Sequence, residues 1–306
     1  MTPLNAEDLR TAPGRRARSA GARWLFLFAS IATIGVSCLI VWTIASEAWT
    51  FASQVEGSQL QTIGWFPRRG MFDLSTLLVN SAQISVVAML VAVPSGLAAA
   101  VYLSEYAHPK TRRVIKPTLE LLASVPSVVL GVFAISFITP AVLSRFFEDI
   151  NFFNKLAAGI AVGLLVIPLI ASISEDALRA VPMALREAAS GLGARKVTTT
   201  LRVVLPAAVS GLMAAIIVGF SRAIGETMVV TIASGGGDTS LFDLSLQESG
   251  GTITSAMAAL GFGTDQVAGN DLAFQSLYFL GALLFLITLG LNFIGNAVVR
   301  RMQERY

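Results

Sequence analysis

The chain has 306 residues, of which 54% are hydrophobic and only 13% are charged, and its mean hydropathy is +0.70. This composition excludes an ordinary soluble domain and predicts an integral membrane protein. The formal net charge of +3 does not indicate nucleic-acid binding, because membrane proteins concentrate Lys and Arg in their cytoplasmic loops.

An arginine-rich segment begins the chain. Residues 1–23 contain five arginines and little apolar sequence, so we expect a mobile cytoplasmic tail. The apolar run at 24–45 is longer than the core of a secretory signal peptide and lacks a clean cleavage site, so it predicts the first membrane span. We assign 24–75 to this span and the outer loop that follows it.

Five further apolar stretches are long enough to cross a bilayer, which predicts an all-α, polytopic membrane protein with six transmembrane helices. Gly159 and Gly163 favour close helix packing within one of them. Asn80, Ser81 and Gln83 lie at the outer end of the stretch 76–102, where they either line a pathway or bond to neighbouring backbone. The five stretches are 76–102, 117–143, 156–173, 206–234 and 276–299.

The distribution of basic residues predicts the orientation. With the N-terminus in the cytoplasm, 17 of the 22 Lys and Arg residues fall on the cytoplasmic side and Arg222 falls within a span. Both termini, including the end at 302–306, are then cytoplasmic. The outer loops hold only Arg68, Arg69, Arg145 and Lys155.

The cytoplasmic loop at 174–205 is polar and helix-forming. Pro182 suits a first helical turn, residues 183–192 are mostly strong helix formers, and Gly193 can end the helix in a left-handed turn. A short helix outside the membrane that is connected at both ends to spans is suited to passing a movement of a soluble partner to the membrane helices.

Two opposite charges lie inside the fifth span. Arg222 and Glu226 are four residues apart, so they share one helical face and can pair, which offsets part of the cost of burying them. Arg222 lies too deep to face lipid and is expected to face the helix bundle. We assign both residues to a translocation pathway, and a pair that only holds helices together is the alternative.

The loop at 235–275 carries five acidic residues and no Lys or Arg, which predicts an extracytoplasmic location. Its three consecutive glycines are not followed by the Gly-Lys-Ser/Thr of a phosphate-binding loop. The apolar stretch 253–262 could form a short helix that rests at the membrane surface or meets an extracytoplasmic partner. The alternative is ordinary packing within the loop. The acidic residues are Asp238, Asp243, Glu248, Asp265 and Asp271.

No catalytic motif is present, so we expect neither an enzyme nor a bound cofactor. The single cysteine, Cys38, lies in an apolar run and is expected to be a buried structural thiol. The single histidine, His108, has no second ligand of its kind, so we expect no metal site. A transporter with this sequence would have to draw its energy from another subunit or from an ion gradient.

The cytoplasmic loop resembles the "EAA" signature of bacterial ABC-importer permeases, with Val203-Val204-Leu205-Pro206 as its distal part and Val203 in place of the usual Ile. The resemblance implies a MetI-like type I ABC-importer permease fold over 76–301. It also implies that the loop is a coupling helix seated on a cytoplasmic ATPase. The residues that match the motif are Glu187, Ala188, Ala189 and Gly193.

The stretch from Arg222 to Met228 resembles the phosphate-importer permeases, of the PstC type, with the PstA type next. Segments at 94–107, 124–129 and 283–301 share this similarity. It implies phosphate as cargo and a bacterial inner membrane as location. The implied partners are a PstA-like second permease, two ATP-binding cassette subunits, an extracytoplasmic phosphate-binding protein and membrane lipid.

Two other functions remain open at this point. The first is import of another oxyanion, such as molybdate, sulfate or phosphonate, because the coupling loop does not encode cargo. The second is an ion-driven carrier, which would need an acidic site and usually two internal repeats. No repeat is found in the sequence.

Overall fold

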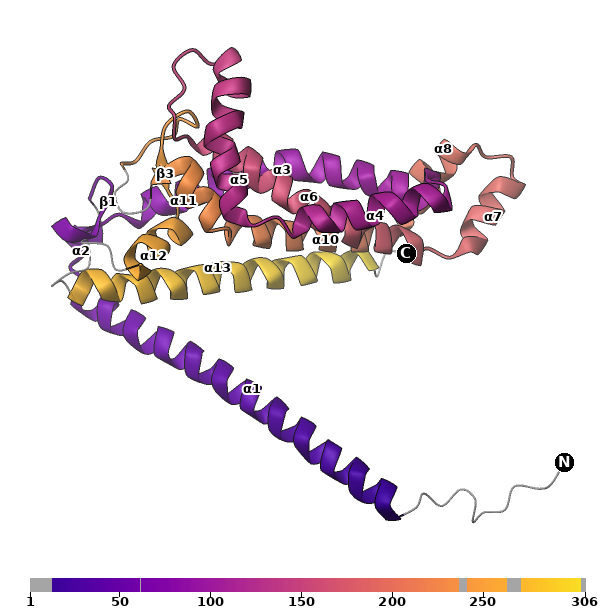
Figure 1. Cartoon of the computed structure of the whole chain (residues 1–306), viewed down its shortest axis with the longest axis horizontal. Coiled ribbons are helices and arrows are strands. Elements are labelled where there is room, and N and C mark those ends of the chain that lie inside the picture. Colours follow the sequence, from indigo (N-terminus) through magenta and orange to yellow (C-terminus); the bar gives the residue numbers. More distant parts are fainter. Residues whose placement is uncertain (1–12, 61, 237–240, 263–270, 304–306) are drawn as a thin grey trace.

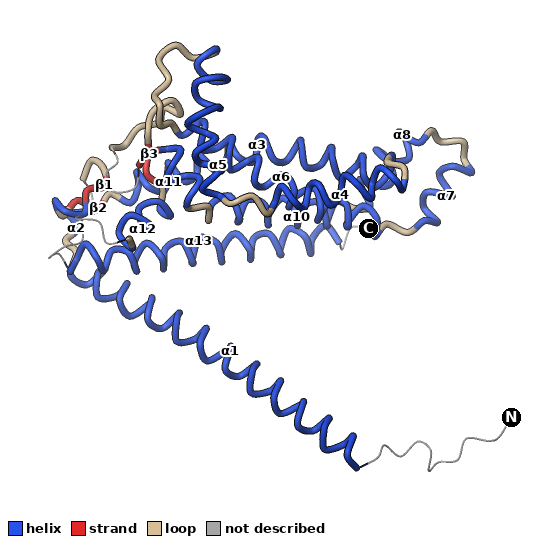
Figure 2. The backbone as a smooth tube through the Cα atoms, in the orientation of Figure 1, coloured by secondary structure: helices blue, strands red, loops and turns tan. Residues whose placement is uncertain are grey.

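The computed structural model describes residues 13–60, 62–236, 241–262 and 271–303. Long helices run roughly side by side along the long axis of the molecule, and shorter helices close both ends (Figures 1 and 2). Strands among the described residues are limited to two pairs of two-residue segments. The predicted all-α architecture is confirmed.

Helix α1 (Pro13–Gln54) diverges from the rest of the molecule (Figure 1). Only its last turns are packed, where the Phe51 ring contacts the rings of Phe72 and Phe279 with centroids 5.0 and 5.1 Å away. Because the middle of the helix has no neighbour within this chain, Cys38 is exposed, and the expectation of a buried thiol was wrong. The helix already begins at Pro13, so the described part of the expected mobile tail is helical.

A compact cap follows α1 at the same end of the molecule. It comprises α2 (Gly57–Leu60), β1 (Trp65–Phe66), the 3₁₀ turn η1 (Pro67–Arg69) and β2 (Met71–Phe72), with β1 antiparallel to β2. Asp73 then starts the next helix by accepting hydrogen bonds from the backbone N–H and hydroxyl of Ser75. Burial raises the pKa of Asp73, but hydrogen bonds from Ser75, Thr76 and Gly64 outweigh it and lower the pKa overall.

Helices α3 (Leu74–Val101) and α6 (Lys155–Ala180) form the central pair. Glycines allow their close approach: a Cβ at Gly159 would lie 2.6 Å from Val87, and one at Gly163 would lie 2.8 Å from the carbonyl oxygen of Ala88. Both helices pass through their prolines, Pro94 and Pro168, without a break. The predicted close packing is confirmed.

The third span differs from its predicted bounds of 117–143. After the π-helical turn η2 (Tyr102–Tyr106), the charged helix α4 (Pro109–Ala123) ends before Pro126, which lacks a backbone N–H donor. The apolar part is α5 (Ser127–Phe133), the π-helical η3 (Ala134–Val142) and the 3₁₀ turn η4 (Leu143–Arg145). The span that is apolar enough to cross a membrane is therefore Ser127–Arg145.

The fifth span is broken twice, whereas the sequence predicted one helix over 206–234. It follows α7 (Met183–Gly191) and α8 (Lys196–Thr199). A bend of 70° at Ala208 follows the π-helical η5 (Thr200–Val204) and Pro206, both of which disturb helical hydrogen bonding. A second break separates its inner and outer parts. The remaining pieces are α9 (Leu205–Ala207), α10 (Val209–Ile224) and α11 (Met228–Ser234).

The chain ends with two helices. Helix α12 (Ile253–Gly261) begins with Thr252, which forms a reciprocal capping box with Ser255, and it is packed inward with Ile253 and Leu260 buried. It follows the parallel pair β3 (Gly235–Gly236) and β4 (Gly250–Gly251). Helix α13 (Asp271–Gln303) then crosses the molecule along its length (Figure 1).

The described residues contain five helices long and apolar enough to span a membrane, and six spans when the bent pair counts as one. Helices α7 and α8 and the end of α13 lie at one end of the molecule, which we call the coupling end (Figure 1). The cap, β3 and α12 lie toward the opposite end. Of the five acidic residues noted in the 235–275 loop, Asp238 and Asp265 lie outside the described residues.

Candidate functional site

The loop that carries the EAA-like sequence folds as predicted into a short helix, α7. Gly193 has φ of +79°, and the backbone N–H groups of Gly193 and Ala194 donate to the carbonyls of Ser190 (2.9 Å) and Ala189 (3.0 Å). These two bonds form a Schellman end, which a left-handed glycine permits without strain. Gly193 therefore determines where α7 ends and the direction in which the chain leaves it.

The four residues assigned to ATPase coupling are placed differently from one another. Glu187, Ala188 and Gly193 are exposed, whereas Ala189 is the buried residue of α7. Helix α7 packs against η5 and α8. The exposed side of this loop also carries Met183, Leu185 and Leu192, the last 90% exposed. An apolar surface on a polar loop is typical of a docking site.

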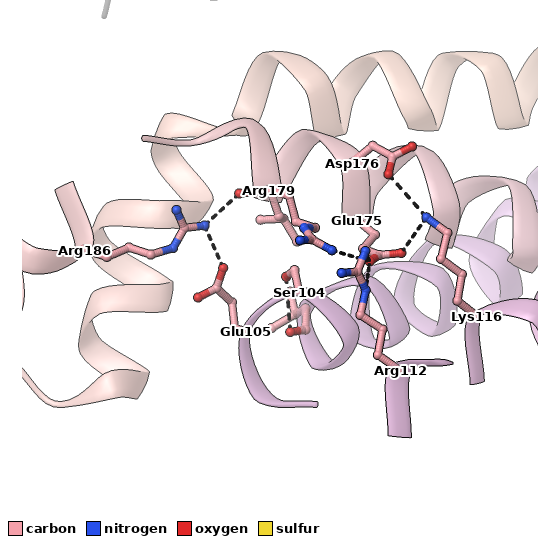
Figure 3. Close-up of polar contacts among 10 residues, drawn as sticks. Ser104, Glu105, Arg112, Lys116, Glu175, Asp176, Arg179 and Arg186 are labelled. Carbon is pink, nitrogen blue, oxygen red and sulfur yellow. Dashed lines mark hydrogen bonds and ion pairs between the residues drawn. The ribbon is translucent and has the colours of Figure 1, made fainter. Parts of the chain in front are cut away.

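Arg186 fastens α7 to the membrane helices, and sequence reasoning missed this residue. Its guanidinium donates to the backbone carbonyls of Val181 (2.5 Å) and Leu178 (2.8 Å). It also pairs with Glu105 at 2.9 Å (Figure 3). Both carbonyls lie at the end of α6, where that of Leu178 also accepts from the N–H of Val181, and Glu105 belongs to η2. One side chain thus connects α7, α6 and the extension of α3.

A second ion-pair group lies next to this contact and centres on Glu175. This carboxylate is fully buried near the end of α6 and pairs with Arg112 (2.5 Å) and Lys116 (3.2 Å) of α4, while Arg179 lies 3.9 Å away (Figure 3). Burial alone lowers the pKa of Lys116, but Glu175 and Asp176 outweigh it and raise that pKa overall. The four-residue spacing of Arg112 and Lys116 was the available signal, because it places both on one face of a helix.

A third buried charge lies at the opposite end. Lys155 was counted from the sequence as an outer-loop residue, yet it is fully buried. Its ammonium donates to the side-chain oxygen of Asn80 (3.1 Å) and the backbone carbonyl of Asp243 (2.5 Å). The Asn80 amide in turn donates to the carbonyl of Gly251 (3.0 Å), and Ser81 accepts from the N–H of Ile253 (3.1 Å). Of the two roles considered for Asn80 and Ser81, the structure shows bonding to backbone.

Arg222 and Glu226 form an ion pair at 3.5 Å, as expected from their spacing. The pair does not lie on one continuous helix, because α10 ends at Ile224 and α11 begins at Met228. Thr254 of α12 stabilises the break by donating its hydroxyl to the backbone carbonyl of Glu226 (2.7 Å). The N–H groups of Gly225 and Glu226 donate to the carbonyls of Ser221 and Ala223, both at 3.3 Å, so the backbone of the break is hydrogen-bonded within this chain.

The two side chains differ in exposure. The Glu226 side chain is 6% exposed, whereas that of Arg222 is 58% exposed. The Arg222 guanidinium therefore lies at the surface of this chain and is not enclosed by the chain's own helices. Within a membrane such a surface must meet water or another subunit rather than lipid.

The described residues contain no group of three or more His, Cys, Asp or Glu side chains that could hold a metal ion. The charged side chains described above form ion pairs with one another or hydrogen bonds to the backbone.

Comparison with known proteins gives a consistent result. Residues 92–306 match the family described as binding-protein-dependent transport system inner membrane component. The phosphate transport system permease protein PstC of Mesorhizobium japonicum is 32% identical, with 86% of this chain and 84% of that protein covered. The probable ABC transporter permease protein YqgH of Bacillus subtilis is 30% identical, with 72% and 75% covered.

Solved structures show the same fold. A bacterial ABC transporter involved in the import of the acidic polysaccharide alginate superposes with a TM-score of 0.65 at 16% identity, over 94% of this chain and 99% of that chain. The inward-facing MetNI methionine ABC transporter gives 0.58 at 20% identity, over 75% and 95%.

Proposed function

Because the chain belongs to the family of binding-protein-dependent transport system inner membrane components, and is thus the permease subunit of an ABC importer, we propose that its cargo is phosphate. In this proposal the chain forms one half of the passage through a bacterial inner membrane. A separate ATPase supplies the energy. A second permease and an extracytoplasmic phosphate-binding protein complete the transporter.

The observation that carries this proposal is the exposed guanidinium of Arg222 beside a broken span. Phosphate that leaves a binding protein must lose water, and a guanidinium offers both charge and directed donors to its oxygens. The similarity to proteins named phosphate transport system permease supports the same cargo.

Glu226 has a complementary role in the proposal. When no anion is bound, its carboxylate neutralises Arg222 across 3.5 Å. When phosphate arrives, the carboxylate repels it, so that the site can release as well as bind. A second permease, of the PstA type, would cover the exposed side of Arg222 and enclose the passage.

Energy coupling is assigned to α7. Its exposed face would lie in a groove of the ATPase, with Glu187, Ala188 and Gly193 in contact or shaping that contact. Arg186 would transmit the movement, because it joins α7 to α6 and η2 through three short contacts. Motion of α7 would then move the inner ends of two central spans.

Arg222 provides the test of this function. Arg222→Gln should abolish uptake of labelled phosphate in cells while the complex still assembles, because the charge is lost but the side-chain volume is nearly kept. Arg222→Lys should restore little uptake, since an ammonium cannot form the same forked contact. The control is Arg145→Gln, an exposed arginine at the end of η4, which should transport normally.

Three results would contradict the proposal. The first is parental uptake by Arg222→Gln, and the second is failure of that variant only because the complex no longer forms. The third is uptake of labelled molybdate or sulfate through the complex that an excess of phosphate does not reduce, which would assign the passage to another oxyanion.

A further inference from the structure

A large cavity at the coupling end is not explained by the transport proposal. Its volume is about 1000 Å³, and it lies between η2, α4, the end of α6, α7 and α8. We call it the basic cavity, because six cationic side chains line it. They are Arg112, Arg113, Lys116, Arg179, Arg186 and Lys196.

The acidic residues around the basic cavity do not balance these cations. Glu105 is paired with Arg186, and the buried Glu175 is paired with Arg112 and Lys116. Glu120 is the other carboxylate of the lining. Among the described residues, neither Arg113 nor Lys196 makes an ion pair, and Lys196 lies over the ring of Tyr106 at 5.0 Å. The cavity therefore keeps an excess of positive charge.

We propose that the basic cavity binds an anion through a phosphate group, with Arg113 and Lys196 as its ligands. Arg113 comes from α4 and Lys196 from α8, and both line the cavity. An arginine fork gives directed donors and a lysine ammonium gives a point charge, a combination suited to phosphate oxygens. The phosphate belongs either to free inorganic phosphate or to the headgroup of an anionic phospholipid.

The cavity can accommodate either free inorganic phosphate or a phospholipid headgroup. It is open and wide enough for a small anion with its water. The same helix, α4, also presents Val114, Leu121 and Leu122 to its surroundings, which are 68%, 68% and 52% exposed. Such an apolar face beside a basic pocket can hold acyl chains while the pocket holds the headgroup.

Binding there would affect the coupling helix. Arg113 belongs to α4, the charged helix that precedes the third span, and Lys196 belongs to α8, which follows α7, so one anion would link α4 to the loop that carries α7. This inference does not depend on the cargo of the transporter, because the cavity is separate from Arg222.

Arginine modification provides the test. The complex, purified through a tag on this chain and placed in phosphatidylcholine nanodiscs, is treated with phenylglyoxal, and modification of Arg113 is measured by mass spectrometry. Arg145, an exposed arginine outside the cavity lining, is the control within the same chain. One arm adds inorganic phosphate against chloride of equal ionic strength, and the other replaces part of the lipid by phosphatidylglycerol.

We expect Arg113 to be protected and Arg145 to be unchanged in one of the two arms. Protection by inorganic phosphate identifies the free anion as ligand, and protection only with phosphatidylglycerol identifies the lipid headgroup. Lys196→Gln should raise the half-protecting concentration about tenfold, because one charge-assisted contact is lost. Lys110→Gln removes an exposed charge outside the cavity lining and should have no effect.

The proposal is overturned if Arg113 is not protected selectively in either arm. It is equally overturned if Lys196→Gln leaves the protection unchanged, or if Lys110→Gln weakens it as much.

Discussion

Gly193 and Arg186 determine how α7 is held, and only the first of these two roles can be recognised from the sequence. The role of Gly193 is local, because a left-handed residue that ends a helix is recognised from its neighbours. Arg186 acts through Glu105, 81 residues earlier in the chain, so no local pattern identifies its contact. Lys155 illustrates the same limit, since its charge predicts solvent exposure and the fold buries it completely.

We predict that Gly193→Ala weakens energy coupling. Nothing lies within 4 Å of an added Cβ, so the penalty comes from φ of +79° alone, about 1 kcal/mol or somewhat more. The variant should show lower ATPase co-purification and lower uptake with normal membrane insertion. Gly191→Ala is the matched control, because its Cβ is equally unhindered and its φ is not positive. Equal behaviour of the two variants would remove Gly193 from the coupling assignment.

At the scale of elements, glycines allow the close packing of the α3–α6 pair. Gly159 and Gly163 are one helical turn apart and bring the backbones of the two helices close together. Helices α1 and α13, by contrast, carry long exposed apolar faces. Such faces suit lipid or a neighbouring subunit.

Gly163→Ala should therefore lower stability. The new Cβ would lie 2.8 Å from the carbonyl oxygen of Ala88, and backbone cannot yield as a side chain can, so we expect a loss of about 1–3 kcal/mol. Gly290→Ala in α13 meets nothing within 4 Å and should be neutral or slightly stabilising, because alanine favours a helix over glycine by about 1 kcal/mol. Thermal unfolding in detergent measures both. A melting temperature for Gly163→Ala equal to that of Gly290→Ala would show that α3 and α6 are not held at this distance.

At the scale of the whole molecule, the elements found at each end of the helix bundle can be compared with the predicted membrane topology. Helices α7 and α8 and the end of α13 share one end, as the assignment of the coupling loop and C-terminus to the cytoplasm requires (Figure 1). The segment around Ser245 lies near the other end, because Asn154, Lys155 and Leu156 at the start of α6 donate backbone hydrogen bonds to Ala233, Glu248 and Leu246.

Cysteine labelling tests this topology. In a Cys38→Ser background, Ser245→Cys should react with a membrane-impermeant thiol reagent in spheroplasts, because Ser245 is exposed in the loop predicted to be extracytoplasmic. Ser190→Cys, at an exposed position of α7, should react only after the membrane is permeabilised. The reverse pattern of labelling in functional variants would invert the topology.

The sequence by itself determined the membrane class, the approximate positions of the spans, the α7 helix and its left-handed end. These follow from local properties, namely hydropathy over one membrane thickness and the preferences of Pro, Gly and helix-forming residues. The resemblance at the cytoplasmic loop also identified the family from residues that lie close together in the chain.

Only the tertiary structure decided the breaks in the third and fifth spans, the exposure of Arg222 and Cys38, and the charge groups at the coupling end. Glu175 meets Arg112 across 63 residues of chain, and the break beside Glu226 is stabilised by Thr254, 28 residues later. Whether a charge is buried, paired or exposed depends on which distant helix lies beside it. Hydropathy and spacing along one segment do not contain that information, because packing between segments determines it.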